Sequence, residues 1–259
     1  MDFSPSPNLE VAPFQPGGVF VSIPVPYRTR HEFVMTFMAN VTMTSATAAM
    51  GQQQGSHGRR PGKPHAGKSG DDLAAIACFN MRSVASMIAS ICTNKVRRRK
   101  KRKLFVWTVS RFVSQAIHLI HAGLRFELKA IRTHETASGY GCPVQEVVTR
   151  WTTFLEELQK RMGKNENPQE ICAWVEYQVR GAIHPFADGN GRLATALCAW
   201  IMLRSKRRIP SYAFWQRSQM HDKLKEGYDA FREYYLKVCF GNPEEMTAPP
   251  PDPLEAAVA

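Results

Sequence analysis

The stretch HPFADGNGR, residues 184–192, joins two segments with the sequence pattern of helices. Before it, residues 167–170 (NPQE) have the order of a helix start, with Asn as cap, Pro at the first helical position and Glu closing a capping box. This helix is predicted to run to about Ile183, because Pro185 disfavours helix at the residue before it. His184 is therefore expected at a helix exit, held by the scaffold.

After the stretch, residues 191–203 predict a second, mostly buried helix. Gly189, Asn190 and Gly191 fall at its N-terminus, where the first backbone N–H groups lack helical partners and the helix dipole is positive. Glycine lets the backbone approach a ligand closely, so these N–H groups predict an anion site. The amide of Asn190 and the forked guanidinium of Arg192 would add to it, and the fork suits phosphate.

Two further side chains give this corner its chemistry. Beside a polyphosphate, the Asp188 carboxylate is expected to hold Mg²⁺ through oxygen. His184 titrates near working pH and is the natural base for an attacking hydroxyl. The plain alternative is a helix-turn-helix corner whose His, Asp and Asn only cap helix ends, and for each residue taken alone that interpretation is favoured.

The complete run resembles the signature of the Fic family, HPFx[DE]GNGR, with every specified position filled. The resemblance implies a mainly α, Fic-like helical bundle with a short β-hairpin flap. It implies that His184 is the general base toward a target protein, that Asp188 binds Mg²⁺, and that residues 189–192 hold nucleotide phosphates. The family reaction transfers AMP from ATP to Ser, Thr or Tyr. Gly191 favours this branch, because the related Doc branch usually has Lys there and transfers a phosphate.

One position departs from the family pattern. Many members carry a second arginine three residues after the first, which contacts the terminal phosphate and pairs with an inhibitory glutamate, and Thr195 stands there. Slow turnover, another nucleotide and loss of autoinhibition all stay open. The inhibitory pattern [ST]xxxE[GN] is not matched convincingly, because residues 6–11 have its spacing but end in Val11 within a Pro-rich segment.

The net charge of +12 is concentrated in one place. The run at residues 95–103 supplies eight positive charges and leaves +4 for the rest. Such a run is either a solvated connector or a site for nucleic acid, an acidic membrane surface or a nuclear import receptor. Six scattered cysteines without a CxxC pair indicate free thiols in a reducing compartment. With no secretory signal and no long apolar run for a membrane span, the expected location is cytoplasmic or nuclear.

The composition divides the chain into three parts. Residues 1–70 form a Pro-, Gly- and Gln-rich, largely flexible region, in which residues 19–43 cannot be placed and residues 62–69 match GxxxxGK[ST] without the preceding strand that a phosphate loop needs. Residues 71–242 are expected to be the Fic-like domain. Residues 243–259 are expected to be a disordered tail.

Within the domain, apolar spacing predicts helices at residues 70–92, 104–122, 143–163 and 220–240, besides the two around the signature. His118 and His121 lie three residues apart and are interpreted as packed or capping groups rather than as a metal pair. Residues 126–132 alternate like a strand, and residues 133–140 suggest a turn and return. By its place before the signature, the segment 126–141 resembles the family's flap, whose strand edge would pair with a target protein.

These observations predict a protein adenylyltransferase that uses Mg²⁺ and ATP. One alternative is a Fic-type transferase of another phosphate-containing group, which Thr195 motivates. The other is a catalytically decayed nucleic-acid-binding or adaptor protein, which the basic run motivates.

Overall fold

The computed structural model of the chain describes residues 32–38, 70–93, 108–123, 129–136, 139–164, 166–211 and 214–241. After a short helix at residues 32–38, its elements are α2 (Gly70–Thr93), α3 (Val109–Ile120), α4 (Val144–Gly163), α5 (Pro168–Tyr177), the π-helix η2 (Gln178–Ala182), α6 (Asn190–Arg204), α7 (Phe214–Glu226) and α8 (Tyr228–Phe240). The described part is mainly helical, as expected.

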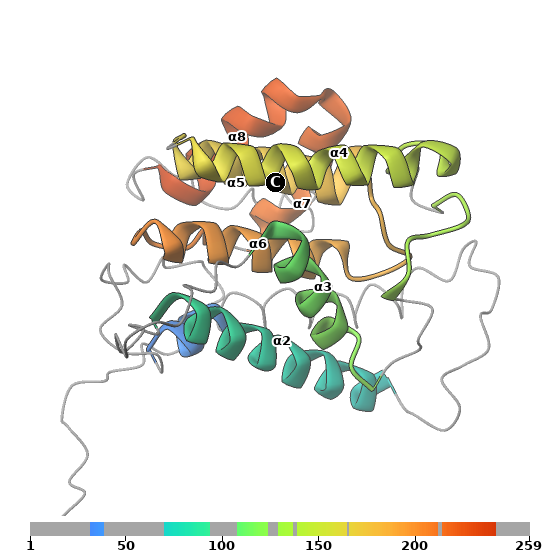
Figure 1. The fold of residues 1–259 in the computed structure, drawn as a ribbon. Helices are drawn as coiled ribbons and strands as arrows, with labels where there is room; N and C mark the ends of the chain where they lie inside the picture. The colour runs from blue at the N-terminus through green and yellow to red at the C-terminus, as the bar shows by residue number, and fades with distance from the viewer. Residues whose placement is uncertain are drawn as a thin grey trace, which may run out of the picture.

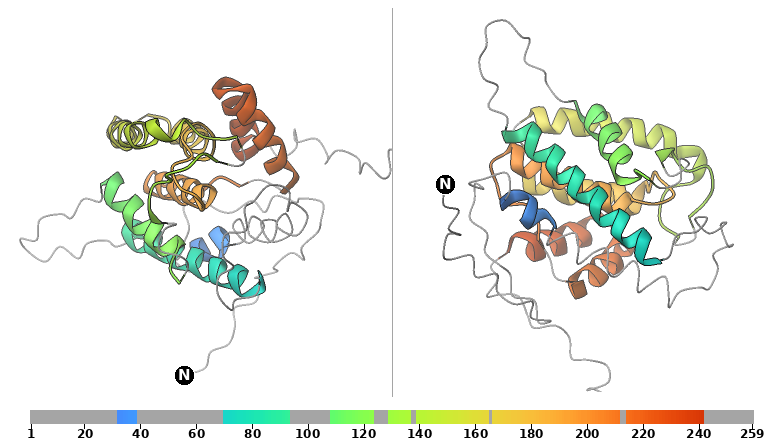
Figure 2. Two further views of the ribbon diagram at one scale, coloured as in Figure 1. Left: turned by 90° about the vertical axis from the view of Figure 1, so that its right-hand side faces the viewer. Right: turned by 90° about the horizontal axis from the view of Figure 1, so that it is seen from below.

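Helix α6 lies at the centre of the bundle (Figure 1). It packs against α2, α3, α5 and η2, while α8 packs on α5 and α7. In the left view of Figure 2, α4, α5 and α6 are seen nearly end-on, so their axes are nearly parallel. Buried residues occur all around α6, from Leu193 to Met202, as in a helix enclosed by neighbours. The site loop at its N-terminus therefore starts from a fixed support.

One hydrophobic core joins the helices. Phe112 of α3 stacks on Trp200 of α6 with ring centroids 4.2 Å apart. Phe33 and Phe37, from the helix at residues 32–38, are also buried in this core. Part of the segment that the sequence could not place thus packs on the helical bundle.

Most helices begin or end close to where the sequence predicts. The Asn167 side chain caps α5 by accepting a hydrogen bond from the Gln169 N–H at 3.2 Å, and Pro168 is the first helical residue. Helix α3, however, begins at Val109, because Thr108 caps it with its side-chain oxygen.

The predicted single helix at residues 220–240 is wrong. It is two helices, α7 and α8, divided at Gly227. The backbone φ of Gly227 is +112°, which lies outside the helical region and which glycine adopts without a steric penalty. Apolar residues on both sides of the break, such as Met220 and Leu224 in α7 and Phe231 in α8, are buried in the same core, so their spacing resembled that of one amphipathic helix.

The β-hairpin flap is not shown within residues 129–136 and 139–143. There the structure has one isolated antiparallel bridge, between Ile131 and Phe186, instead of a strand ladder. The remaining residues of the expected flap, 126–128 and 137–138, lie outside the described residues, as do the basic run at 95–103 and the tail at 243–259. The roles given to these segments, the domain limits and the cytoplasmic or nuclear location stay predictions.

Helix α2 contains an 18-residue window, Ala75–Cys92, whose mean hydropathy of 1.5 would suffice for a membrane span. Within the bundle, Met81, Val84 and Ile88 of this window pack in the core. Because core helices also pass a test of length and composition, the window is weak evidence for a span. The expected lack of a span stays a prediction.

Candidate functional site

The chain leaves α5 through the widened turn η2. The Ile183 N–H donates to the carbonyl of Gln178, five residues back, at 2.8 Å. His184 then has φ +48°, a left-handed conformation that residues with a side chain seldom adopt. Single π-turns and strained residues both occur frequently at functional sites. A strained residue persists only where the surrounding structure holds it, so contacts with the rest of the protein must maintain the conformation of this loop.

The imidazole of His184 is half-buried and oriented by one hydrogen bond. Its Nδ1 lies 2.8 Å from the carbonyl oxygen of Arg180. A carbonyl can only accept, so Nδ1 carries the proton and Nε2 keeps its lone pair. Burial is the main influence on the pKa of His184 and lowers it. The hydrogen bond to the Arg180 carbonyl and the charge of Asp188 raise it, the charges of Arg132 and Arg180 lower it, and the net shift is downward. The ring is neutral at neutral pH, as a general base must be.

A buried arginine far away in sequence clamps the His184 turn. Arg132 donates from Nε to the carbonyl of His184 at 2.8 Å, and its backbone N–H donates to the carbonyl of Pro185 at 2.9 Å. Its Nη2 donates to the carbonyl of Cys142. Gly141 packs closely against this guanidinium, and a Cβ added at residue 141 would lie only 2.8 Å from Nη2 of Arg132. Neither Arg132 nor Gly141 is predicted from the sequence, because no local pattern connects them with residue 184.

The next part of the loop is closed by Asn190 and Phe186. The Phe186 N–H donates to Oδ1 of Asn190 at 3.0 Å, and Nδ2 of Asn190 donates back to the Phe186 carbonyl at 2.7 Å. The Phe186 ring packs edge-on against Trp151 of α4, with centroids 5.6 Å apart. Phe186 is a packing residue. The Asn190 side chain shapes the loop, and its assignment to the phosphates stays a prediction.

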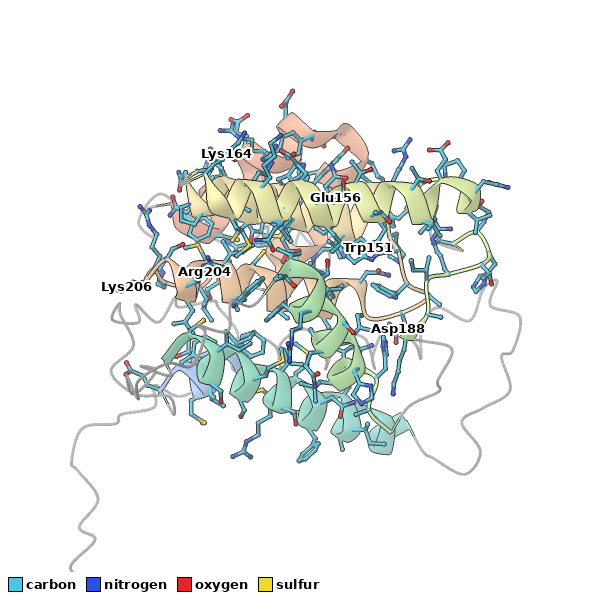
Figure 3. All side chains as sticks on the ribbon, in the orientation of Figure 1. Trp151, Glu156, Lys164, Asp188, Arg204 and Lys206 are labelled. Atoms are coloured by element: carbon cyan, nitrogen blue, oxygen red, sulfur yellow. The ribbon has the colours of Figure 1, made fainter. Side chains whose placement is uncertain are left out.

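Asp188 and Arg192 are paired at the N-terminus of α6. Figure 3 labels Asp188 at the end of this helix opposite to Arg204. The Gly189 N–H donates to Oδ1 of Asp188 at 2.6 Å, and Nη2 of Arg192 lies 2.7 Å from Oδ2. The Asp188 side chain is 58% exposed and that of Arg192 only 18%. The backbone amide and the guanidinium that the sequence assigns to phosphate thus hold the chain's own carboxylate.

The electrostatic surroundings keep this carboxylate ionised. Partial burial raises the pKa of Asp188, but the charge of Arg192 and the hydrogen bond from Gly189 lower it by more, so the net shift is downward. Mg²⁺ is commonly held by one or two carboxylates together with substrate phosphates and water. Among the described residues, no group of three or more His, Cys, Asp or Glu side chains is placed so that it could hold a metal ion by itself. An exposed, ionised Asp188 fits a magnesium ion that arrives with a nucleotide.

Gly189 lies on a buried histidine. Its φ is +82°, and a Cβ added there would be 2.8 Å from Nε2 of His121. His121, which follows α3, is fully buried, and neither ring nitrogen has a hydrogen-bond partner within the described part of the chain. Burial, followed by the charge of Arg192, lowers the pKa of His121 to about 4. His121 is a packed group, as the sequence analysis expected, but its place beneath the loop was not foreseen.

Gly191 is needed for a different reason. A Cβ added at Gly191 would lie 2.6 Å from Nη1 of Arg180, a residue of η2. Nη2 of Arg180 donates to Oγ1 of Thr195 at 3.1 Å, and that hydroxyl donates to the Gly191 carbonyl at 3.0 Å. Nε of Arg180 is ion-paired with Glu176. A guanidinium from the preceding helix therefore covers the first turn of α6.

Comparisons with known proteins show which family and which folds the chain resembles. The family model described as "Fic/DOC family" matches residues 112–202, which include the loop and most of α3 and α6. Among solved structures, 18 chains match. No curated protein sequence matches the chain.

Two of these structures come from a bacterium and a nematode. One is a Fic-domain-containing signalling protein from Bacteroides thetaiotaomicron, with a TM-score of 0.55 and 18% identity over 81% of this chain and 83% of the other. The second is a fragment of Fic-1 from C. elegans, with a TM-score of 0.53 and 18% identity over 83% of this chain. The match covers 64% of the C. elegans fragment. At this identity the likeness shows the fold.

Proposed function

We propose that this protein is a Fic-type transferase that moves AMP from ATP to a hydroxyl group of a target protein. The match of residues 112–202 to the Fic/DOC family model supports this proposal. The observation that carries the proposal is that the N-terminus of α6 already holds an anionic group, the carboxylate of Asp188. The amide of Gly189 and the guanidinium of Arg192 both bind the Asp188 carboxylate. Donors that hold a carboxylate at a helix N-terminus also suit the oxygens of a phosphate.

His184 is the base in this reaction. Its Nε2 accepts the proton of the target's Ser, Thr or Tyr hydroxyl as the hydroxyl oxygen attacks the α-phosphorus of ATP. A new bond forms between that oxygen and phosphorus, the bond from the α-phosphorus to the bridging oxygen breaks, and pyrophosphate leaves. The proton then passes from His184 to solvent. The fixed Nδ1–H keeps Nε2 available throughout, because the Arg180 carbonyl determines the tautomer.

Nucleotide binding exchanges the partners of Asp188. For phosphate oxygens to reach the Gly189 amide and Arg192, the carboxylate must leave both. Asp188 is also the residue that would hold Mg²⁺, which would offset the negative charge of the phosphates. The exchange keeps each charge paired, since the guanidinium moves from carboxylate to phosphate. The exposure of Asp188 leaves it room to move.

The target protein is proposed to lie along the segment 126–141. The described part of this segment is tied to the site at two places. Ile131 forms its bridge with Phe186, and the Tyr140 hydroxyl donates to the carbonyl of His221 in α7 at 3.1 Å. A backbone held beside His184 in this way would offer hydrogen bonds to an extended target segment with little demand on its side chains.

Labelling with ATP tests the proposal. The purified protein is incubated with cell lysate, Mg²⁺ and α-labelled ATP, beside the variants His184→Ala and His118→Ala. His118 is exposed on α3, so it serves as a matched control. We expect labelled target proteins with the wild type and His118→Ala and none with His184→Ala. Absence of label in every reaction would refute AMP transfer, and equal label with His184→Ala would refute the role of the histidine.

A second candidate keeps the site and changes the group transferred. Thr195 motivates it, because many family members have a phosphate-contacting arginine there. Parallel reactions with α-labelled and γ-labelled ATP separate the two, since AMP transfer leaves the α label on the target and phosphate transfer leaves the γ label.

A further inference from the structure

The guanidinium of Arg180 lies at the first turn of α6, although Arg180 belongs to η2. Its Nη1 is 2.6 Å from the position that a Cβ of Gly191 would occupy. In a helix the Cα–Cβ bond points toward the N-terminus. Gly191 is the second residue of α6, so the guanidinium lies beside the first turn of this helix, the turn whose unpaired N–H groups and dipole attract anions.

Two side chains hold the Arg180 fork in this place. Glu176, one turn earlier on the same helical segment, accepts from Nε, and Thr195 accepts from Nη2. The side chains of Arg180 and Glu176 are 9% and 3% exposed. Thr195 is oriented in turn by the Gly191 carbonyl. A guanidinium held by buried partners loses little conformational entropy when it binds a ligand.

Arg180 and Thr195 meet although they lie 15 residues apart in sequence. Position 195 is where the sequence departs from the family pattern by lacking an arginine. The structure brings a guanidinium to this same position from the preceding helix, and the hydroxyl of Thr195 provides its anchor. A guanidinium thus lies beside the loop, supplied by a different residue and paired with the carboxylate of Glu176.

Resting on the proposed function, we propose that Arg180 is a second phosphate-binding arginine of this site, which contacts the β- and γ-phosphates of ATP beside Arg192. Its contribution distinguishes a triphosphate from a monophosphate, since AMP has no phosphate beyond the one that is transferred. A side chain at residue 191 would have to displace this guanidinium.

The test measures nucleotide affinity rather than transfer. Isothermal titration in the presence of Mg²⁺ uses AMP and an ATP analogue with a methylene group between the α- and β-phosphates, so that no AMP is transferred. Arg180→Gln/Glu176→Gln removes both charges together and leaves no buried unpaired carboxylate. The matched control is Arg161→Gln/Glu157→Gln, an i,i+4 ion pair on α4 away from the site. Thermal unfolding verifies that each variant is folded.

We expect Arg180→Gln/Glu176→Gln to bind the ATP analogue about 10- to 100-fold more weakly, the usual effect of losing a hydrogen bond from a charged group. The affinity for AMP should change less than about threefold, and the control should bind both like the wild type. Adding Thr195→Arg to the variant should recover part of the lost affinity, because residue 195 would then carry a guanidinium to the same phosphates.

Three results would overturn the proposal. Unchanged affinity for the ATP analogue would show that Arg180 does not contact the phosphates. An equal loss for the ATP analogue and AMP, or no recovery with Thr195→Arg, would reduce Arg180 to a structural role. In these cases the proposed function survives. If the folded wild type binds neither nucleotide, the proposed function fails and this inference with it.

Discussion

Asn190→Ala tests whether the loop is held together by one side chain. Asn190 is 3% exposed, and both halves of its amide bind the backbone of Phe186, at 3.0 and 2.7 Å. Truncation leaves a buried N–H and a buried carbonyl without partners, at about 1–3 kcal/mol each. Water entering the space recovers part of this cost, so we expect the free energy of unfolding to fall by about 2–4 kcal/mol.

The measurement is urea unfolding of the wild type, Asn190→Ala and Asn167→Ala. Asn167 is the matched control, because it makes one hydrogen bond at the exposed start of α5 and its loss should cost about 1 kcal/mol. Hydrogen exchange at the Phe186 amide should also quicken in Asn190→Ala, since its acceptor is gone. The reasoning is refuted if the two variants lose the same stability or if the Phe186 amide stays equally protected.

The remaining predictions concern three residues around the loop. Gly191→Ala should destabilise the protein by about 1–3 kcal/mol, because the clash of the added methyl group with Arg180 outweighs the helix propensity of alanine. Gly163→Ala is the control and should not destabilise the protein, because the space around its added methyl group is open. Thermal unfolding of both variants tests this. His121 has a folded-state pKa of about 4, below its ordinary value, so the unfolded state binds the proton first as the pH falls. Stability should therefore drop between pH 6.5 and 4 by up to about 3 kcal/mol, and chemical unfolding across that range should show a smaller drop in His121→Gln; identical pH profiles would contradict the assignment. Arg132→Lys keeps the charge but loses the fork that binds the His184 turn, so we expect a loss of about 2–4 kcal/mol and slower transfer with nearly unchanged nucleotide affinity. A variant with wild-type stability and rate would count against the clamp.

Local sequence signals were sufficient for most of the helices. The Asn-Pro start of α5 and the exit before Pro185 depend on residues within one or two turns, and both occur as predicted. The helix at 220–240 failed because hydrophobic spacing cannot show that Gly227 adopts a positive φ between two helices that share one core. The flap's first strand is not shown within residues 129–132, where an alternating pattern is also compatible with a single bridge to Phe186.

The sequence by itself determined which groups gather at the corner, because His184, Asp188 and the glycines before Arg192 are neighbours along the chain. The tertiary structure decided what surrounds them. Arg132 reaches the carbonyl of His184 from 52 residues away, and His121 lies beneath Gly189 because α3 packs against α6. Such contacts depend on how helices pack, and the packing sums many weak interactions over the whole core, so no pattern within a few residues records them.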